Sequence, residues 1–225
     1  MFKYETHLHT APVSRCGKVS VFDNLKFYKD IGYDGVFITN HFIGGSFNYD
    51  VSKPYKEVVE FYFSDYEEAQ KIGKEIGIQV FCGVEHTFEG ADFLIYGLGK
   101  EWYLENEQIP AMKASEFLSF ARESGAFIVQ AHPFREARYI DHIHLFPRHV
   151  DAVEIINASH ECLEDEMAKK YAEHYGLIPF AGSDNHHGAE KPRLAGLCFK
   201  TPVKDENDFI NKIKKGEAQL FLTLR

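Results

Sequence analysis

The sequence predicts an α/β fold in which helices cover both faces of a largely parallel sheet. Short apolar runs alternate with longer amphipathic runs along most of the chain. Continuous apolar runs are typical of strands that are buried on both faces. The 225 residues contain no linker-like or low-complexity segment, so we expect a single domain over residues 1–225. This pattern alone fits a closed barrel and an open doubly wound sheet equally well.

The first half of the chain is expected to contain two helices and four strands. Residues 20–31 have apolar positions at helical spacing, and Gly32 ends that helix. Residues 54–76 form a second amphipathic run that begins at Pro54 and ends at Gly77, in keeping with the terminal preferences of these residues. The expected strands are residues 2–9, 34–39, 78–84 and 92–98.

The second half of the chain continues the alternation. Helices are expected at 113–124 and 160–175, which end at Gly125 and Gly176, and at about 205–215. Strands are expected at 126–131, 151–157 and 177–183, with late candidates at 194–200 and 219–224. Neither GxGxxG nor GxxxxGK[ST] occurs in the sequence, which weakens a nucleotide-binding interpretation of the fold.

Composition excludes several classes of protein. With 25 Lys and Arg against 34 Asp and Glu, the formal net charge is −9, which argues against binding to long nucleic acids. No apolar run approaches the ~18 residues of a membrane helix, and the N-terminus carries charges where a signal peptide would be apolar. We therefore expect a cytoplasmic protein without a membrane partner. The four cysteines show no CxxC spacing and are interpreted as reduced thiols.

Histidines and carboxylates gather where the expected strands end. They are His7 and His9, His41, Glu85 and His86, His132, His160, and Asp184 with His186. In a barrel all of these positions lie at the C-terminal mouth. Residues i and i+2 of an extended segment point the same way, so His7 and His9 can hold one ion. Imidazole and carboxylate ligands suit Zn²⁺, Mn²⁺ or Fe²⁺, so the pattern predicts a metal site.

Five short motifs occur in a fixed order: HLHT, T-x-H, G-x-E, A-H-P-F and G-S-D-x-H. They span residues 7–186, and in this order they resemble the PHP family (polymerase and histidinol phosphatase domain). The resemblance implies a distorted (β/α)7 TIM-like barrel, which decides the choice of fold. It also implies two or three divalent metal ions (Zn, Mn or Fe) and hydrolysis of a phosphate ester by a metal-bridging hydroxide.

Seven residues match metal-ligand positions of that family. They are His7, His9 and Asp184 for a first metal, Glu85 as the bridge between two metals, His41 and His186 for a second metal, and His132 for a third. The resemblance is thus carried by a nearly complete ligand set.

The sequence departs from the family pattern at three positions. Asp92 stands where the family often has a histidine, and as a carboxylate it can still bind metal. Cys16 lies where an aspartate or histidine is usual, and it is either a ligand that favours Zn²⁺ or a small buried residue. Asn40 replaces an aspartate and removes a charge that is expected to orient a ligand.

Three further residues are candidates for contact with substrate. Arg135 and Arg193 are candidate phosphate contacts, because guanidinium matches phosphate geometry. His160 is a candidate to protonate the leaving group. The expected substrate is a small phosphorylated molecule, either a phosphomonoester or a nucleotide. Two alternatives remain: an amidohydrolase-type hydrolase, which shares the HxH motif and a late aspartate, and a non-catalytic metal-binding module.

Overall fold

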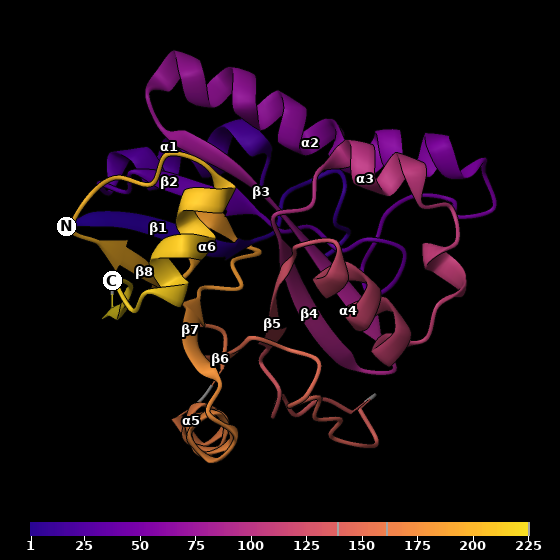
Figure 1. The fold of residues 1–225 in the computed structure, drawn as a ribbon. Helices are drawn as coiled ribbons and strands as arrows, with labels where there is room; N and C mark the ends of the chain where they lie inside the picture. Colours follow the sequence, from indigo (N-terminus) through magenta and orange to yellow (C-terminus); the bar gives the residue numbers. More distant parts are fainter. Residues whose placement is uncertain (139, 161, 225) are drawn as a thin grey trace.

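The computed structural model describes residues 1–138, 140–160 and 162–224. The strands of these residues form one nine-stranded sheet (Figure 1). The strands are β1 (Phe2–Leu8), β2 (Gly35–Ile38), β3 (Gln79–Phe88), β4 (Ala91–Tyr96), β5 (Phe127–Ala131), β6 (Ala152–Asn157), β7 (Ile178–Gly182), β8 (Arg193–Phe199) and β9 (Gln219–Leu224). Their order in the sheet is β7-β6-β5-β4-β3-β2-β1-β8-β9. Every strand position expected from the apolar runs is therefore confirmed.

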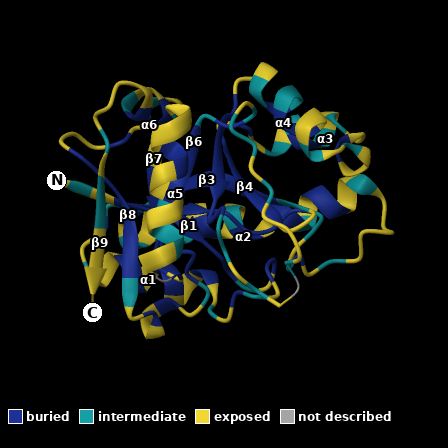
Figure 2. Cartoon of the chain, turned by 90° about the horizontal axis from the view of Figure 1, so that it is seen from below, coloured by how far each residue is buried: buried dark blue, intermediate teal, exposed yellow. Residues whose placement is uncertain are grey.

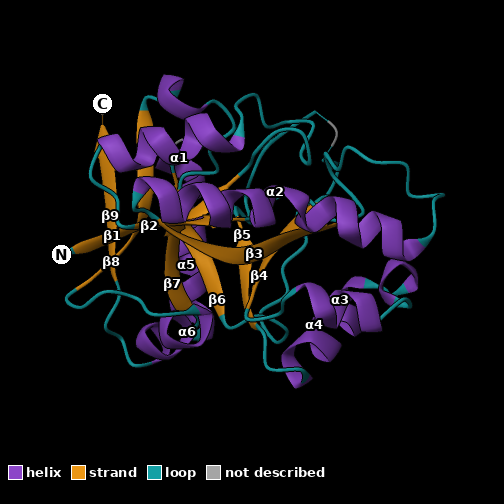
Figure 3. Cartoon of the chain, turned by 90° about the horizontal axis from the view of Figure 1, so that it is seen from above, coloured by secondary structure: helices purple, strands orange, loops and turns teal. Residues whose placement is uncertain are grey.

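Helices surround this sheet, as Figure 3 shows. They are α1 (Val21–Asp30), α2 (Tyr55–Ile76), α3 (Lys100–Glu105), α4 (Ala114–Glu123), α5 (Cys162–Tyr175) and α6 (Glu206–Lys214), with short 3₁₀ turns at Ile109–Ala111 and Gly188–Glu190. The short helix α3 was not predicted, and residue 161 of the predicted helix 160–175 lies outside the described residues. Among the helices of the described residues, none combines the length and apolarity needed to cross a bilayer.

The sheet curls until β7 returns to β1, which makes a nearly closed barrel. Just beyond β7, the amide of Asn185 donates to the carbonyl of His7 (3.2 Å), and the amide of His9 donates to the carbonyl of Asn185 (3.1 Å). Within the two strands themselves, Oγ1 of Thr6 in β1 donates to the carbonyl of Ala181 in β7. The distorted TIM-like barrel expected from the motifs is confirmed.

Strand direction differs from the expectation of a parallel sheet. β4 is antiparallel to both β3 and β5, β8 is antiparallel to β1, and β9 is antiparallel to β8. β3 and β4 are joined by Glu89 and Gly90, both with positive φ (49° and 86°), which is the backbone of a tight hairpin. Two residues are too few for a crossover, and apolar periodicity does not report strand direction.

A layer of aromatic side chains fills the barrel interior at the end away from the mouth. Phe37, Tyr96 and Phe180 come from three strands, and Phe209 of α6 packs against all three, with ring centroids 4.2 Å, 5.6 Å and 6.4 Å away. Helix α6 therefore closes the barrel at this end. Figure 2 shows the buried strands inside and the exposed outer faces of the helices. Polar side chains are concentrated at the opposite end, the mouth.

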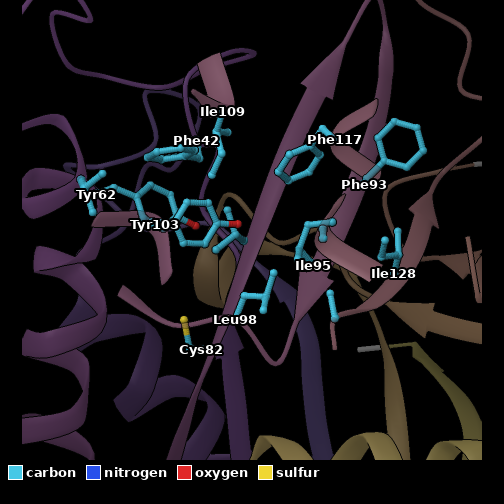
Figure 4. Close-up of a cluster of buried hydrophobic side chains, with 14 of the residues drawn as sticks. Phe42, Tyr62, Cys82, Phe93, Ile95, Leu98, Tyr103, Ile109, Phe117 and Ile128 are labelled. Carbon is cyan, nitrogen blue, oxygen red and sulfur yellow. The ribbon is translucent and has the colours of Figure 1, made fainter. Parts of the chain in front are cut away.

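A second cluster of buried side chains packs outside the barrel between the β3–β4 hairpin and helices α2, α3 and α4 (Figure 4). His86 lies within it, with its ring 4.1 Å from that of Phe117 and its Nε2 3.1 Å from the hydroxyl of Tyr103. Burial lowers the pKa of His86 to about 3, so this ring is neutral. Although His86 follows Glu85 directly, it faces this outer cluster and not the mouth.

Candidate metal centre

A local irregularity in β1 turns His7, and His9 just beyond the strand, into the barrel. Tyr4 belongs to the inner aromatic layer, whereas Leu8 packs outside against α1, although strict alternation would put both on one face. The register of β1 against β2 shifts between Glu5 and Leu8. Oε1 of the buried Glu5 accepts hydrogen bonds from the amides of Thr6 and His7, at 3.0 Å each. Such bulges commonly re-aim side chains beside functional sites.

The β3–β4 hairpin supplies two carboxylates. β3 does not end at Glu85 but continues to Phe88, so Glu85 lies within the strand. It points into the barrel on the same face as Phe81, which lies four residues earlier. Asp92 lies on the facing strand, pairs in register with Thr87 and accepts a 2.5 Å hydrogen bond from its hydroxyl. The hairpin thus extends both carboxylates to the mouth of the barrel.

Glu85 is the centre of the cluster. Its Oε1 lies 3.2 Å from Nε2 of His7 and 3.5 Å from Nε2 of His132. Its Oε2 lies 3.2 Å from Nε2 of His9 and 3.1 Å from Nδ1 of His41. The carboxylate is buried, and neither oxygen has a hydrogen-bond partner among the described residues. Unpartnered buried oxygens between two pairs of imidazoles are the arrangement expected of a carboxylate that bridges cations.

Asp184 forms the other acidic side of the cluster. Its Oδ1 lies 3.3 Å from Nε2 of His9, 3.5 Å from Nε2 of His186 and 3.6 Å from Nε2 of His7. Its backbone is left-handed (φ 49°), a conformation that a non-glycine residue adopts at a cost. The carbonyl of Asp184 accepts hydrogen bonds from Ser159 Oγ (2.9 Å) and from the buried Nζ of Lys191 (3.3 Å), which hold it in place.

The charge states of the cluster suit cation binding. Burial, together with neighbouring His186, lowers the pKa of His9 to about 4, and burial also lowers the pKa values of His41 and His186. Burial alone would raise the pKa values of Glu85 and Asp184, but the surrounding histidines outweigh it and hold both well below their ordinary values. Neutral imidazoles and ionised carboxylates are the forms that bind metal.

His7 and His132 are set apart from the other histidines by the carboxylates around them. Burial disfavours their charged forms, but Glu154, Asp184 and Glu85 hold the pKa of His7 well above its ordinary value. Glu85 and Asp92 likewise raise the pKa of His132 to about 8. Metal binding at these two rings would therefore displace a proton.

The donor atoms fall into groups of the size that a metal ion needs. Among the residues that the structure describes, four groups have all ligand atoms within 4.8 Å of one another: His7, His9 and Asp184; His9, His41 and Glu85; His7, Glu85 and His132; and His9, Cys16 and His186. Asp92 adjoins them, with Oδ2 3.8 Å from Nε2 of His132. All eight predicted ligands thus converge at the mouth, and their donor set fits divalent cations.

Glu154 of β6 supports two of these ligands and was missed in the sequence. Its Oε1 accepts from Nδ1 of His7 (3.0 Å), and its Oε2 accepts from the backbone amide of His132 (3.1 Å) and from Nδ2 of Asn157 (2.8 Å). The first bond directs Nε2 of His7 toward Glu85. The second holds the left-handed backbone of His132 (φ 27°). The available signal was a charged residue within a strand that is otherwise apolar as far as its last residue, Asn157.

Glu154→Gln is expected to weaken divalent-metal binding by about 10- to 100-fold while leaving a folded protein. All three groups that approach Glu154 are donors, and a glutamine offers only one acceptor oxygen. Calorimetric titration of metal-free protein with Zn²⁺ or Mn²⁺ measures the effect, with the exposed Glu166→Gln as control. Equal affinities in the two variants would show that Glu154 has no positioning role.

A second supporting residue, Asp65 of α2, was also missed. Asn40 donates from Nδ2 to Oδ2 of Asp65 (3.1 Å) and to Oγ1 of Thr10 (2.8 Å), and Thr10 Oγ1 donates to the same carboxylate oxygen (2.7 Å). The negative charge that Asn40 lacks is thus supplied by the neighbouring helix. This network fixes the turn that follows His9.

A pocket of about 400 Å³ opens over the cluster. Its lining includes Cys16, Asp92 and Arg135, whose Nη1 lies 4.0 Å from Oδ2 of Asp92, but it does not include Arg193. Arg193 instead donates from Nη1 to the carbonyl of His160 (2.5 Å). The ring of His160 stacks on that of His132, with centroids 5.2 Å apart. The structure therefore brings Arg135 and His160 beside the predicted metal ligands and places Arg193 behind His160.

No family model matches the sequence, and no curated protein matches it. Among solved structures, the chain is similar to a two-domain protein from Bacteroides vulgatus that contains a predicted PHP-like metal-dependent phosphoesterase (TM-score 0.70, 16% identity). That match covers 98% of this chain and 64% of the neighbour, so the chain spans less than two thirds of that protein.

Two further solved structures are similar over nearly their whole length. One is a protein from Bifidobacterium adolescentis assigned as a metal-dependent phosphoesterase (TM-score 0.58, 14% identity, 93% of this chain and 95% of that chain). The other is PsfC from Pseudomonas syringae (TM-score 0.63, 16% identity, 100% and 93%). At these identities the likenesses establish the fold, and at that level they confirm the resemblance to PHP proteins.

Proposed function

We propose that this protein is a metal-dependent phosphoesterase that hydrolyses a small phosphomonoester or nucleotide at the mouth of the barrel. The observation that carries the proposal is the buried Glu85 carboxylate, whose two oxygens have no hydrogen-bond partner in the described part of the chain and each face a pair of imidazoles. The ordered motifs and the PHP-like solved structures support the same activity.

In this proposal the ligand set holds two or three divalent ions. His7, His9 and Asp184 would hold the first ion, His41 and His186 would hold the second, and Glu85 would be shared between the two. His132 and Asp92 would hold a third. When bound, such ions lower the pKa of coordinated water toward neutrality and neutralise charge on the phosphoryl oxygens.

The remaining residues bind the ester and its leaving group. Arg135 lines the pocket and offers its guanidinium to a phosphate oxygen. Burial, together with His132, lowers the pKa of His160 to about 4, so its neutral ring would donate a hydrogen bond to the departing oxygen. Full protonation of that oxygen by His160 stays a prediction. Arg193 fixes the backbone of His160 through its carbonyl, and a direct contact of Arg193 with phosphate stays a prediction.

The test is to purify the protein without chelator and measure bound metal. Hydrolysis is then assayed on phosphomonoesters, phosphodiesters and nucleotides with added Mn²⁺, Zn²⁺ or Fe²⁺. We expect at least about one ion per chain and turnover of a monoester or nucleotide. Amides and lactones in the same panel probe the amidohydrolase alternative. Bound metal without turnover of any ester would leave the non-catalytic module as the explanation and refute the proposal.

Cys16→Ser is expected to weaken Zn²⁺ binding by about tenfold, or about 1.4 kcal/mol, and to change Mn²⁺ binding far less. The Cys16 thiol groups with His9 and His186, and thiolate ligands select Zn²⁺ over Mn²⁺. Burial raises the pKa of this thiol to about 11, so binding to it must release a proton. Competitive metal titration measures both affinities, with the exposed Cys162→Ser as control. An unchanged Zn²⁺ affinity would mean that Cys16 is only a small, partly buried residue.

A further inference from the structure

A second pocket, of about 420 Å³, lies beside the metal centre between the segment after β5 and the start of α5. Four apolar side chains line it: Phe134, Ile143, Leu163 and Met167. Three of them are unusually exposed for their size, with Leu163 at 64%, Ile143 at 49% and Met167 at 38%. A concentration of exposed apolar side chains around a concavity marks a binding site more often than an inert surface.

This apolar pocket adjoins the pocket over the metal ligands. Arg135 lines both of them. His160 lines the apolar pocket and stacks its ring on that of His132, so a single side chain separates the apolar pocket from a predicted metal ligand. A molecule whose phosphate lies at the metal centre beside Arg135 would therefore place its other end in the apolar pocket.

The charged residues that line the apolar pocket restrict which chemical groups of the substrate can bind there. Glu136 and Glu164 both line the pocket, and the amide of Glu136 donates to Oε1 of Glu164 (3.1 Å), which holds the two acidic residues together. These two carboxylates outnumber the one guanidinium of the lining, that of Arg135, and disfavour a second phosphate at this end, because like charges repel at short range. A sugar would find hydrogen-bond partners in Ser159, Glu136 and Glu164, but it would leave the four apolar side chains of the lining in water. An alcohol with an apolar chain covers those side chains and is therefore favoured.

We propose that the apolar pocket is the leaving-group subsite and that the substrate is a phosphomonoester of an apolar alcohol. This inference rests on the proposed function, and within it favours monoesters over nucleotides. Hydrolysis of such an ester breaks the bond between phosphorus and the alcohol oxygen. The oxygen of water adds to phosphorus, and one proton of that water leaves with the alcohol. The products are inorganic phosphate and an apolar alcohol.

The kinetic test compares ethyl phosphate with hexyl phosphate, whose leaving alcohols have similar acidity. We expect kcat/KM to rise about twofold for each added methylene, on the order of tenfold in total, which corresponds to partial burial of the chain. Leu163→Ser should reduce this hexyl-to-ethyl ratio to about threefold or less. Phe22→Ser, which alters another exposed apolar residue, on α1, should leave the ratio unchanged.

A binding test separates this inference from the proposed function. Hexylphosphonate and ethylphosphonate carry a P–C bond that hydrolysis does not cleave, and calorimetry on the metal-loaded protein gives their affinities. Tighter binding of hexylphosphonate, lost in Leu163→Ser, supports the subsite even if no ester is hydrolysed. Hydrolysis of ethyl phosphate with neither a hexyl preference nor tighter hexylphosphonate binding would overturn the subsite and leave the phosphoesterase proposal standing.

Discussion

Glu85→Gln is expected to lower the metal content and to reduce phosphoester hydrolysis on the order of 10³-fold, the equivalent of several kcal/mol of transition-state stabilisation. Glutamine keeps the volume of the side chain but replaces one carboxylate oxygen with an amide nitrogen, which cannot accept a bond or bind a cation. Oε1 of Glu85 faces His7 and His132, and Oε2 faces His9 and His41. In either orientation of the glutamine amide, one of these two pairs of histidines therefore faces a nitrogen that cannot bind a cation.

The measurement is metal content by elemental analysis together with kcat/KM on the best substrate of the panel. Circular dichroism shows whether the variant is folded. Glu101→Gln, an exposed residue on α3, is the matched control and should retain both metal and activity. A folded Glu85→Gln protein with the metal content of the original chain would contradict the bridging role.

Gly182→Ala is expected to destabilise the fold by about 3 kcal/mol, which lowers Tm by about 6–12 °C in a chain of this size. A Cβ at residue 182 would lie 2.5 Å from Oε1 of Glu154 and 2.6 Å from Cβ of His7. Both neighbours are buried and joined by a hydrogen bond, so neither has room to move. The end of β7 therefore needs glycine so that His7 and Glu154 can meet.

Thermal unfolding and metal titration together test this steric requirement. The variant should also bind divalent metal more weakly, because the added methyl group separates His7 from the carboxylate that orients it. Gly99→Ala is the control, since a Cβ there meets nothing within 4 Å and the residue does not have positive φ. Similar Tm values for the two variants would show that the barrel absorbs the methyl group without displacing the pair.

The positions of strands and helices could be predicted because burial and glycine stops act locally. Gly32, Gly77, Gly125 and Gly176 all have positive φ at or just beyond helix ends, as the sequence suggested. The directions of β4, β8 and β9 could not be predicted in this way. A strand buried on both faces has the same apolar run whether it pairs parallel or antiparallel.

The sequence predicted that the candidate ligands converge at the mouth of the barrel, but strand alternation explains that convergence only in part. The i, i+2 rule places His7 and His9 on one face, yet only the register shift before Leu8 makes that face the inner one. Glu154 and Asp65 left no motif, because their partners lie far away in the chain: Glu154 pairs with His7, 147 residues distant. Such support depends on how strands and helices meet in space.

The sequence by itself determined which residues are candidate metal ligands, because the HxH, G-x-E and G-S-D-x-H motifs combine ligand types with local spacing. Only the tertiary structure decided which donors share an ion-sized space, that Arg135 lies beside Asp92, and that Arg193 lies behind His160. The physical reason is that ligand chemistry belongs to single side chains, whereas distances between them depend on barrel closure. The apolar pocket formed by Phe134, Ile143, Leu163 and Met167 likewise exists only once the segment after β5 meets α5.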